Sequence, residues 1–119
     1  MDRKETTGIS PRDQRFLKSV LAIVQENISN QELNVMWLSR WLGVSRVTLH
    51  RKLKSITGLS AGAYIRTVRL DHAARLLNDE GCNIRQAAKG SGFYNLSYFS
   101  KCFRAQFGCR PSEFVGHRA

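Results

Sequence analysis

Acidic residues, cysteines and long apolar runs are all scarce in this sequence. Its 119 residues contain nine Asp and Glu against 19 Lys and Arg, a formal net charge of +10. The three cysteines (Cys82, Cys102 and Cys109) are odd in number and lack CxxC spacing, so neither a disulfide framework nor a zinc site is indicated. No apolar run approaches the roughly 20 residues of a membrane span, and the polar N-terminus is no secretory signal. We therefore expect a cytoplasmic protein that makes no membrane contact through these residues, with its thiols serving as small buried apolar groups.

The side-chain sets that catalysis and metal binding require are also missing. The acids are scattered without a carboxylate pair, and His50, His72 and His117 lack metal-ligand spacing. The segment Gly90-Ser91-Gly92 resembles a phosphate-binding loop only superficially, because no strand precedes it and it has no third glycine. We expect no enzyme activity, no metal site and no cofactor in this chain.

The few acids avoid two long basic stretches. No Asp or Glu occurs from Leu33 to Leu70, which holds seven Lys and Arg, or from Gly81 to Ser112, which holds five. A solvated surface without a partner would mix charges of both signs. Together with a pI near 10.3, this segregation favours an anionic partner.

The two basic stretches carry the same pattern, about fifty residues apart. After Gly43 and after Gly92, each copy has an apolar pair at i, i+4, a second glycine, and then an aromatic residue followed by a β-branched one. These residues are Leu49, Leu53, Gly58, Tyr64 and Ile65 in the first copy and Phe99, Phe103, Gly108, Phe114 and Val115 in the second. Two copies of one small helical unit in a basic chain suggest a reader of two neighbouring stretches of a repetitive partner. Duplex DNA is such a partner.

Helical periodicity and capping residues predict an all-α fold. A scaffold helix begins at Ser10-Pro11, short helices are predicted over 35–42 and 84–91, and reading helices over 46–56 and 96–107 follow the caps Ser45 and Asn95. A helix over 61–77, about 26 Å long, is apolar on more than one face, and a short helix follows Pro111. The order matches two helix-turn-helix units joined by a long connecting helix.

We accordingly expect four segments. They are a flexible lead-in (1–9), a first helix-turn-helix subdomain with its scaffold helix (10–58), the connecting helix (59–79) and a second helix-turn-helix subdomain (80–119). A connecting helix of this length, with the widths of the units it joins, can set two reading helices near the roughly 34 Å between successive major-groove segments on one side of DNA.

Two stretches resemble the DNA-binding domain of the AraC-type transcriptional regulators. Residues 38–77 do so through Leu38, Gly43, Ser45, Leu49, Arg51, Gly58, Tyr64-Ile65, Arg69-Leu70, Ala73 and Leu76-Leu77. Residues 84–114 do so through Ile84, Ala88, Gly92-Phe93, Tyr98-Phe99, Phe103, Phe107-Gly108 and Pro111-Ser112. The lead helix and the run SRVTLHRKLKSITGLS are also similar to the output domain of hybrid two-component sensors, in which a sensor and a histidine kinase precede this domain.

The resemblance implies sequence-specific binding of double-stranded DNA by two recognition helices in successive major grooves. It implies regulation of transcription, for which we expect activation, with RNA polymerase as a further partner and the nucleoid as location. We expect the isolated domain to be a monomer, because dimerisation in this family would be supplied by parts absent from these residues. The alternative is an RNA-binding or protein-docking helical module.

The second unit departs from the family pattern. Ala87 replaces a large aliphatic residue, Ser91 replaces Val or a similar residue, and Val115 stands where an Arg is usual. Gly90 falls inside the predicted helix, where Gly costs about 0.8–1 kcal/mol relative to Ala. The sequence therefore predicts that the 84–91 helix is short, frayed or underpacked.

Residues in the first turns of a recognition helix, on the side away from the core, reach base edges. We predict base contacts by Arg46, Val47, His50 and Arg51 in the first unit and by Leu96, Ser97 and Lys101 in the second. Arg51 suits guanine O6 and N7, and Val47 suits a thymine methyl. Phosphate contacts are predicted for Ser45, Thr48, Lys54, Asn95, Ser100 and Arg104. Trp37 and Trp41 are predicted to be packing residues rather than a stacking platform for single strands.

Overall fold

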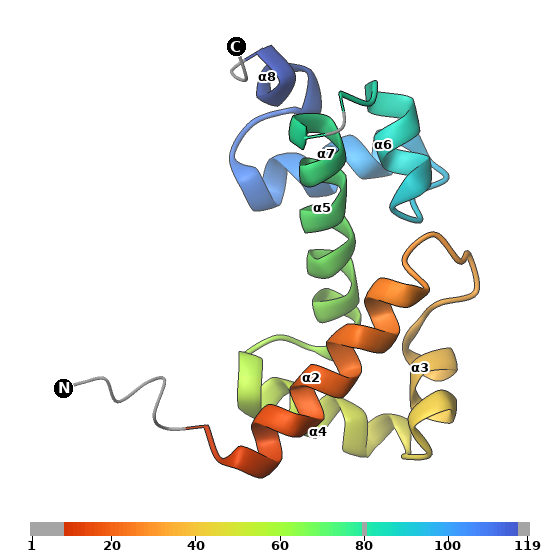
Figure 1. The fold of residues 1–119 in the computed structure, drawn as a ribbon, viewed down its shortest axis with the longest axis vertical. Helices are drawn as coiled ribbons and strands as arrows, with labels where there is room; N and C mark the ends of the chain where they lie inside the picture. The colour runs from red at the N-terminus through yellow and green to blue at the C-terminus, as the bar shows by residue number, and fades with distance from the viewer. Residues whose placement is uncertain (1–8, 80, 117–119) are drawn as a thin grey trace, which may run out of the picture. The chain divides into compact units, whose positions relative to one another are not determined.

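The computed structural model describes residues 9–79 and 81–116. Within these ranges the chain forms seven α-helices and no strand, so the prediction of an all-α fold is confirmed (Figure 1). The helices fall into two compact units. The first comprises the chain up to Glu26 together with Leu33–Ile65, and the second comprises Asn27–Glu32 together with the chain from Arg66 onward. Most of the predicted lead-in lies outside the described residues.

The first unit is a three-helix bundle that includes the start of a fourth helix. In it, α2 (Pro11–Glu26) packs against both α3 (Val35–Leu42) and α4 (Arg46–Thr57) (Figure 1). Each helix contributes side chains that are 0% exposed: Val20, Val24, Leu38, Leu49 and Leu53. The periodicity of these apolar positions therefore determines which face of each helix is buried.

Capping residues define where the helices of the first unit begin and end. The Ser10 side chain accepts a hydrogen bond from the Asp13 backbone N–H at 3.1 Å, and Asn34 accepts one from Trp37 at 2.8 Å. Gly43 ends α3 at a φ of +73°, in the left-handed region that glycine adopts without steric cost. The tight turn at Gly43 brings α3 and α4 together as a helix-turn-helix pair.

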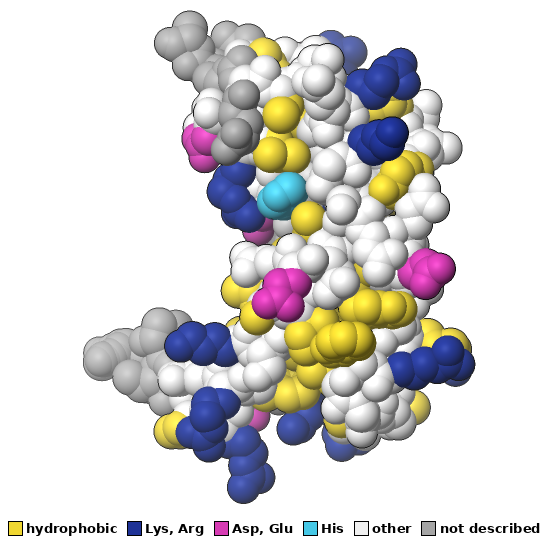
Figure 2. Space-filling model, turned by 45° about the vertical axis from the view of Figure 1, so that its right-hand side comes forward, with side chains coloured by type: hydrophobic (Ala, Val, Ile, Leu, Met, Phe, Trp, Pro, Cys, Tyr) yellow, Lys and Arg dark blue, Asp and Glu magenta, His cyan; other side chains and the backbone are white. Residues whose placement is uncertain are grey.

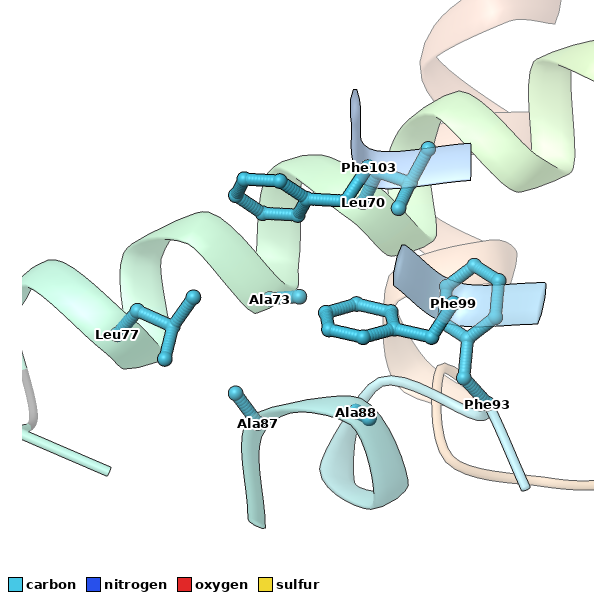
Figure 3. Close-up of a cluster of buried hydrophobic side chains, with 8 residues drawn as sticks. All are labelled: Leu70, Ala73, Leu77, Ala87, Ala88, Phe93, Phe99 and Phe103. Atoms are coloured by element: carbon cyan, nitrogen blue, oxygen red, sulfur yellow. The ribbon is translucent and has the colours of Figure 1, made fainter. Parts of the chain in front are cut away.

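The second unit is built around the later part of α5 (Ala61–Asp79), which packs with α6 (Ile84–Gly90), α7 (Leu96–Phe107) and α8 (Pro111–Gly116). Its core joins apolar side chains of α5, α6 and α7 with Phe93 from the turn between the last two. They are Leu70, Ala73, Leu77, Ala87, Ala88, Phe93, Phe99 and Phe103 (Figure 3). The alanines leave room for the phenylalanine rings, and the centroids of Phe99 and Phe103 lie 5.6 Å apart.

The helix α6 has only seven residues, so the prediction that it is short is confirmed. It ends at Gly90, and both Ala87 and Ala88 are buried. A Cβ added at Gly90 would lie 3.2 Å from Leu76 Cδ1, so the missing side chain allows α5 to approach closely. Ser91 is 0% exposed, and its Oγ lies 2.9 Å from His72 Nδ1. The residues that depart from the family pattern, Ala87, Gly90 and Ser91, therefore contribute to this core or contact it.

Most of the loop between α2 and α3, Asn27–Glu32, belongs to the second unit, although both helices belong to the first. The Arg69 guanidinium donates hydrogen bonds to the carbonyls of Ile28 at 3.4 Å and Asn30 at 2.9 Å. The Tyr94 hydroxyl donates to the carbonyl of Ser29 at 2.7 Å. Three consecutive carbonyls of the loop are therefore held by side chains of the second unit.

Candidate nucleic-acid interface

The first recognition helix, α4, begins at a well-formed cap. The Ser45 side chain accepts a hydrogen bond from the Thr48 N–H at 3.0 Å, and its hydroxyl donates to Thr48 Oγ1 at 3.0 Å. Leu49 and Leu53 are fully buried on one face. Because side chains on a helix repeat every 3.6 residues, this burial turns the opposite face of α4 toward solvent.

The residues predicted to read bases in the first unit share that exposed face. Arg46, Val47, His50 and Arg51 are all exposed, and Val47 has 72% of its surface in contact with solvent. Val47 is an apolar contact point on a largely polar surface. Of the predicted phosphate contacts, Ser45 and Lys54 are exposed, whereas Thr48 is half-buried and bonded to Ser45.

The second recognition helix, α7, repeats this arrangement with different side chains. The Asn95 side chain caps it by accepting a hydrogen bond from the Tyr98 N–H at 2.9 Å. Phe99 and Phe103 are fully buried where the first unit has Leu49 and Leu53. Both recognition helices therefore rest on an apolar pair at i, i+4, as the sequence repeat predicts.

The predicted contact residues of α7 differ in their exposure. Ser97, Lys101 and Arg104 are exposed, as is the cap Asn95, whereas Ser100 is half-buried. Leu96 is half-buried and packs against the second core. The geometry therefore supports Ser97 and Lys101 as base contacts more strongly than it supports Leu96.

Two residues beside this surface, Tyr98 and Arg110, were not among the predicted DNA contacts. Tyr98 follows Ser97 on α7 and is 50% exposed, and its ring centroid lies 6.1 Å from that of Phe93. Arg110 follows α7 and lines a hollow of about 440 Å³ with Ser100, Lys101, Arg104 and Ala105. The signal for Arg110 was present in the sequence, since it lies in the acid-free stretch two residues after the second repeat's closing glycine.

The cations of both recognition helices are available to a partner. Within the described structure, Arg46, Arg51 and Lys54 on α4 and Lys101 and Arg104 on α7 form no ion pair with a carboxylate. On the face drawn in Figure 2, Lys and Arg side chains stand out from each unit, and acidic side chains are present as well. An unpaired cationic surface of this kind suits a polyanion.

Trp37 and Trp41 pack against each other rather than into the core. Their rings are stacked, with centroids 5.4 Å apart and planes inclined by 6°, and Trp41 remains 65% exposed. The stacked rings agree with the prediction that they are packing residues, with Trp37 half-buried and Trp41 exposed.

Other candidate sites were sought in the parts of the chain that the structure describes. No group of three or more His, Cys, Asp or Glu side chains there is placed to hold a metal ion, and His117 lies outside those parts. The three cysteines are free and half-buried, and Cys82 and Cys102 pack against the second core. Among the described helices, none combines the length and apolar character needed to cross a membrane.

Comparison with known proteins identifies curated relatives. The chain is 40% identical over 106 residues to a protein named histidine kinase P4 from Formosa agariphila, a match that covers 89% of the chain and 8% of that protein. It is 26% identical over 133 aligned positions to the HTH-type transcriptional activator RhaS of Escherichia coli, covering 94% of the chain and 48% of RhaS. The chain therefore spans less than half the length of either relative.

Solved structures show the same fold. An AraC-type transcriptional regulator from Chromobacterium violaceum matches 92% of the chain and 97% of its own with a TM-score of 0.82 at 28% identity. The DNA-binding domain of the global transcriptional factor AdpA, solved in complex with a target DNA, matches 85% of the chain and 90% of its own with a TM-score of 0.77 at 27% identity. A family model described as a helix-turn-helix domain matches residues 38–117, which include both recognition helices. The chain belongs to the AraC-type helix-turn-helix family.

Proposed function

We propose that this chain binds double-stranded DNA sequence-specifically through α4 and α7 and thereby regulates transcription. The observation that carries the proposal is the pair of capped helices, each with one fully buried face and one exposed face free of acids. An α-helix presented in this way fits the major groove, where base edges carry a distinct pattern for each base pair. The AdpA domain, whose structure was solved with a target DNA, has the same fold.

The proposed contacts divide by position along each helix. Base contacts come from Arg46, Val47, His50 and Arg51 on α4 and from Leu96, Ser97 and Lys101 on α7. Phosphate contacts come from Ser45, Thr48 and Lys54 in the first unit and from Asn95, Ser100 and Arg104 in the second. Arg51 is the strongest candidate for reading a guanine, because its guanidinium is exposed, forms no ion pair and can donate two parallel hydrogen bonds.

We further infer that the chain is the output domain of a longer protein that activates transcription by contacting RNA polymerase in the cytoplasm, on the nucleoid. Two relatives support this inference: RhaS is named a transcriptional activator, and the histidine kinase relative is far longer than the matched region. In such a protein any kinase activity would lie outside these residues. Dimerisation would also be supplied by other parts of the protein, and the domain alone would be a monomer.

To test the proposal, a duplex that binds tightly is first selected from random sequences. The affinities of two single-residue variants for this duplex and for a random duplex are then measured. Arg51→Ala should weaken binding to the selected duplex by about 1–3 kcal/mol and relax the preference at one base pair. Lys54→Ala should weaken binding to selected and random duplexes alike and reduce the slope of log K against log salt by about one. Fluorescence anisotropy titrations over a range of salt concentrations measure both quantities.

Two results would contradict the proposal. If Arg51→Ala left the affinities for selected and random duplexes unchanged, Arg51 would not read a base. If structured RNA displaced the selected duplex from the unmodified chain at about 150 mM salt, where long-range electrostatic attraction is largely screened, the chain would be an RNA-binding module.

A further inference from the structure

The hollow beside α7 is lined mainly by the aliphatic stems of three cationic side chains, and it extends past the end of the helix. We call it the α7 hollow; it is lined by Ser100, Lys101, Arg104, Ala105 and Arg110. Lys101 and Arg104 project from the exposed face of α7, whereas Arg110 comes from the segment that leads into α8. Three residues that carry a positive charge, from two elements, therefore line one open hollow.

Arg110 is held in place by one acidic residue. Its backbone N–H donates a hydrogen bond to Glu113 Oε1 at 2.9 Å, and its guanidinium donates to Glu113 Oε2 at 3.2 Å. Both side chains remain largely exposed, at 61% for Arg110 and 46% for Glu113. The second of these bonds orients the guanidinium and leaves its other N–H groups available to a further partner.

The first unit has no counterpart to this cation. Two residues after Gly58, at the position that corresponds to Arg110, it has Ser60, whose Oγ accepts a hydrogen bond from the Ala63 N–H at 3.1 Å. Ser60 therefore only caps α5. The segment leading into α8 is also closed by a side chain that accepts a backbone N–H, but there the acceptor is Glu113, which leaves the Arg110 side chain available.

We propose that Arg110 contacts a phosphate group of the DNA backbone beside the α7 hollow, with Glu113 as the residue that positions it. The inference rests on the proposed function. The first turns of a recognition helix read bases, and the C-terminal part of such a helix contacts the backbone, as in homeodomains. The hollow lies at the C-terminal half of α7, and a guanidinium matches the geometry of a phosphate through two parallel hydrogen bonds.

Glu113 also limits how strongly the hollow attracts DNA. The hydrogen bonds from Arg110 lower the pKa of Glu113, so its carboxylate stays ionised at neutral pH beside the cations. Its charge offsets part of the attraction to any phosphate, whatever the base sequence. Glu113→Gln keeps an oxygen that can accept the Arg110 N–H and removes this charge. The variant should therefore bind all duplexes more tightly.

The experiment measures anisotropy titrations on a selected and a random duplex from 50 to 200 mM salt, a range over which phosphate contacts change affinity strongly. Arg110→Ala should weaken binding to both duplexes by a similar factor and lower the salt slope by about one. Glu113→Gln should tighten binding to both by about two- to fivefold, as expected for exposed charges. Arg12→Ala, which removes an exposed arginine of α2, is the matched control and should leave the slope unchanged.

The outcomes separate the hollow from the proposed function. If the unmodified chain prefers the selected duplex with a steep salt slope and Arg110→Ala shows the same slope and affinity, Arg110 does not contact a phosphate. If the unmodified chain shows no preference between the duplexes, the proposed function fails, whatever Arg110→Ala does. Circular dichroism melting of Arg110→Ala checks that α8 is retained, and Arg110→Lys, which keeps the charge, should preserve the slope.

Discussion

His72 and Ser91 form the most unusual side-chain pair in the second unit. His72 is half-buried on α5, and its Nδ1 lies 2.9 Å from the fully buried Ser91 hydroxyl. Burial lowers the pKa of His72, and the positive charge of Arg75 lowers it further. The folded chain therefore binds a proton at His72 less readily than the unfolded chain, whose histidine titrates near pH 6.5.

This difference predicts a loss of stability in mild acid. As the pH falls through about 6.5 toward the lower pKa of the folded state, the unfolded chain takes up a proton first, and the free energy of unfolding decreases. His72→Gln, which can keep a hydrogen bond to Ser91, should lack this decrease. Urea unfolding of both proteins between pH 7.5 and pH 5, roughly one unit or more on each side of the reference value, measures the difference.

Asp71 also changes the stability with pH, so the unfolding free energy of His72→Gln must be compared with that of the unmodified chain at each pH. Burial raises the pKa of Asp71, while Arg75 and the Gln106 side chain lower it. A carboxyl with a raised pKa adds stability as the pH falls, the opposite of His72. Because both proteins contain Asp71, the difference between their unfolding free energies isolates the histidine. Parallel curves for the two proteins would rule out the histidine contribution.

Alanine substitutions at Gly92 and Gly108 should destabilise the fold for different reasons. At Gly108 only the backbone conformation is strained, whereas at Gly92 the added methyl group also meets neighbouring atoms. Both have positive φ, +89° and +80°, where any other residue is strained. A Cβ at Gly108 would meet nothing within 4 Å, whereas at Gly92 it would lie 2.6 Å from the Ile28 carbonyl oxygen and 2.6 Å from Arg69 Nε. Gly108→Ala should therefore cost about 1–2 kcal/mol of unfolding free energy, the backbone cost alone.

Gly92→Ala should cost distinctly more, because the loop carbonyl and the Arg69 guanidinium must move to admit the methyl group. Urea unfolding at neutral pH compares the two variants. Equal costs would mean that the loop at Ile28 yields easily and that the Arg69 hydrogen bonds do not hold it.

The sequence predicts which side chains of the recognition helices are exposed. It does not predict the hydrogen bonds that single polar side chains make with residues distant in sequence. Helical periodicity alone places Val47 and Arg51 opposite Leu49. The bond between His72 and Ser91 joins residues 19 apart in sequence, and the bonds of Arg69 to the loop join residues 39 and 41 apart. No local pattern encodes such separations, so these contacts could not be predicted from the sequence.

Helix ends were predictable where a cap defines them. The ends of α3 and α7 agree with prediction, because Asn34, Gly43, Asn95 and Gly108 act as caps. The helix α4 continues one residue past the predicted Ile56, since the Thr57 hydroxyl donates a hydrogen bond to the Leu53 carbonyl at 2.7 Å. Its closing Gly58 still ends it. Sequence therefore predicts a helix terminus to within one residue where a capping side chain or a closing glycine marks it.

The two units show that one helical pattern can be stabilised by different cores. The first unit buries aliphatic side chains of α2, α3 and α4, whereas the second buries three phenylalanines among alanines and leucines of α5 and α6 (Figure 3). The repeat in the sequence predicted the shared pattern. The different side chains packed around it explain why the two copies keep similar spacing with little identity, since a core requires volume and periodicity more than particular residues.

If α4 and α7 read one duplex, binding should depend on the spacing of the two half-sites. The helix α5 runs without a break for 19 residues and contributes to both units, so we expect it to resist stretching. Inserting about five base pairs, half a DNA turn, between the half-sites should reduce affinity to that of a duplex with one half-site. Anisotropy titrations at constant salt concentration compare the three duplexes.

An insertion of about ten base pairs distinguishes a stiff connection from a flexible one. It returns the second half-site to the original face of the duplex but moves it by roughly 34 Å along the axis. A continuous helix cannot lengthen by that amount, so this duplex should also bind like a single half-site. Recovery of full affinity with the ten-base-pair insertion would show that the connection opens. Full affinity with the five-base-pair insertion would show that only one of the two helices reads the DNA.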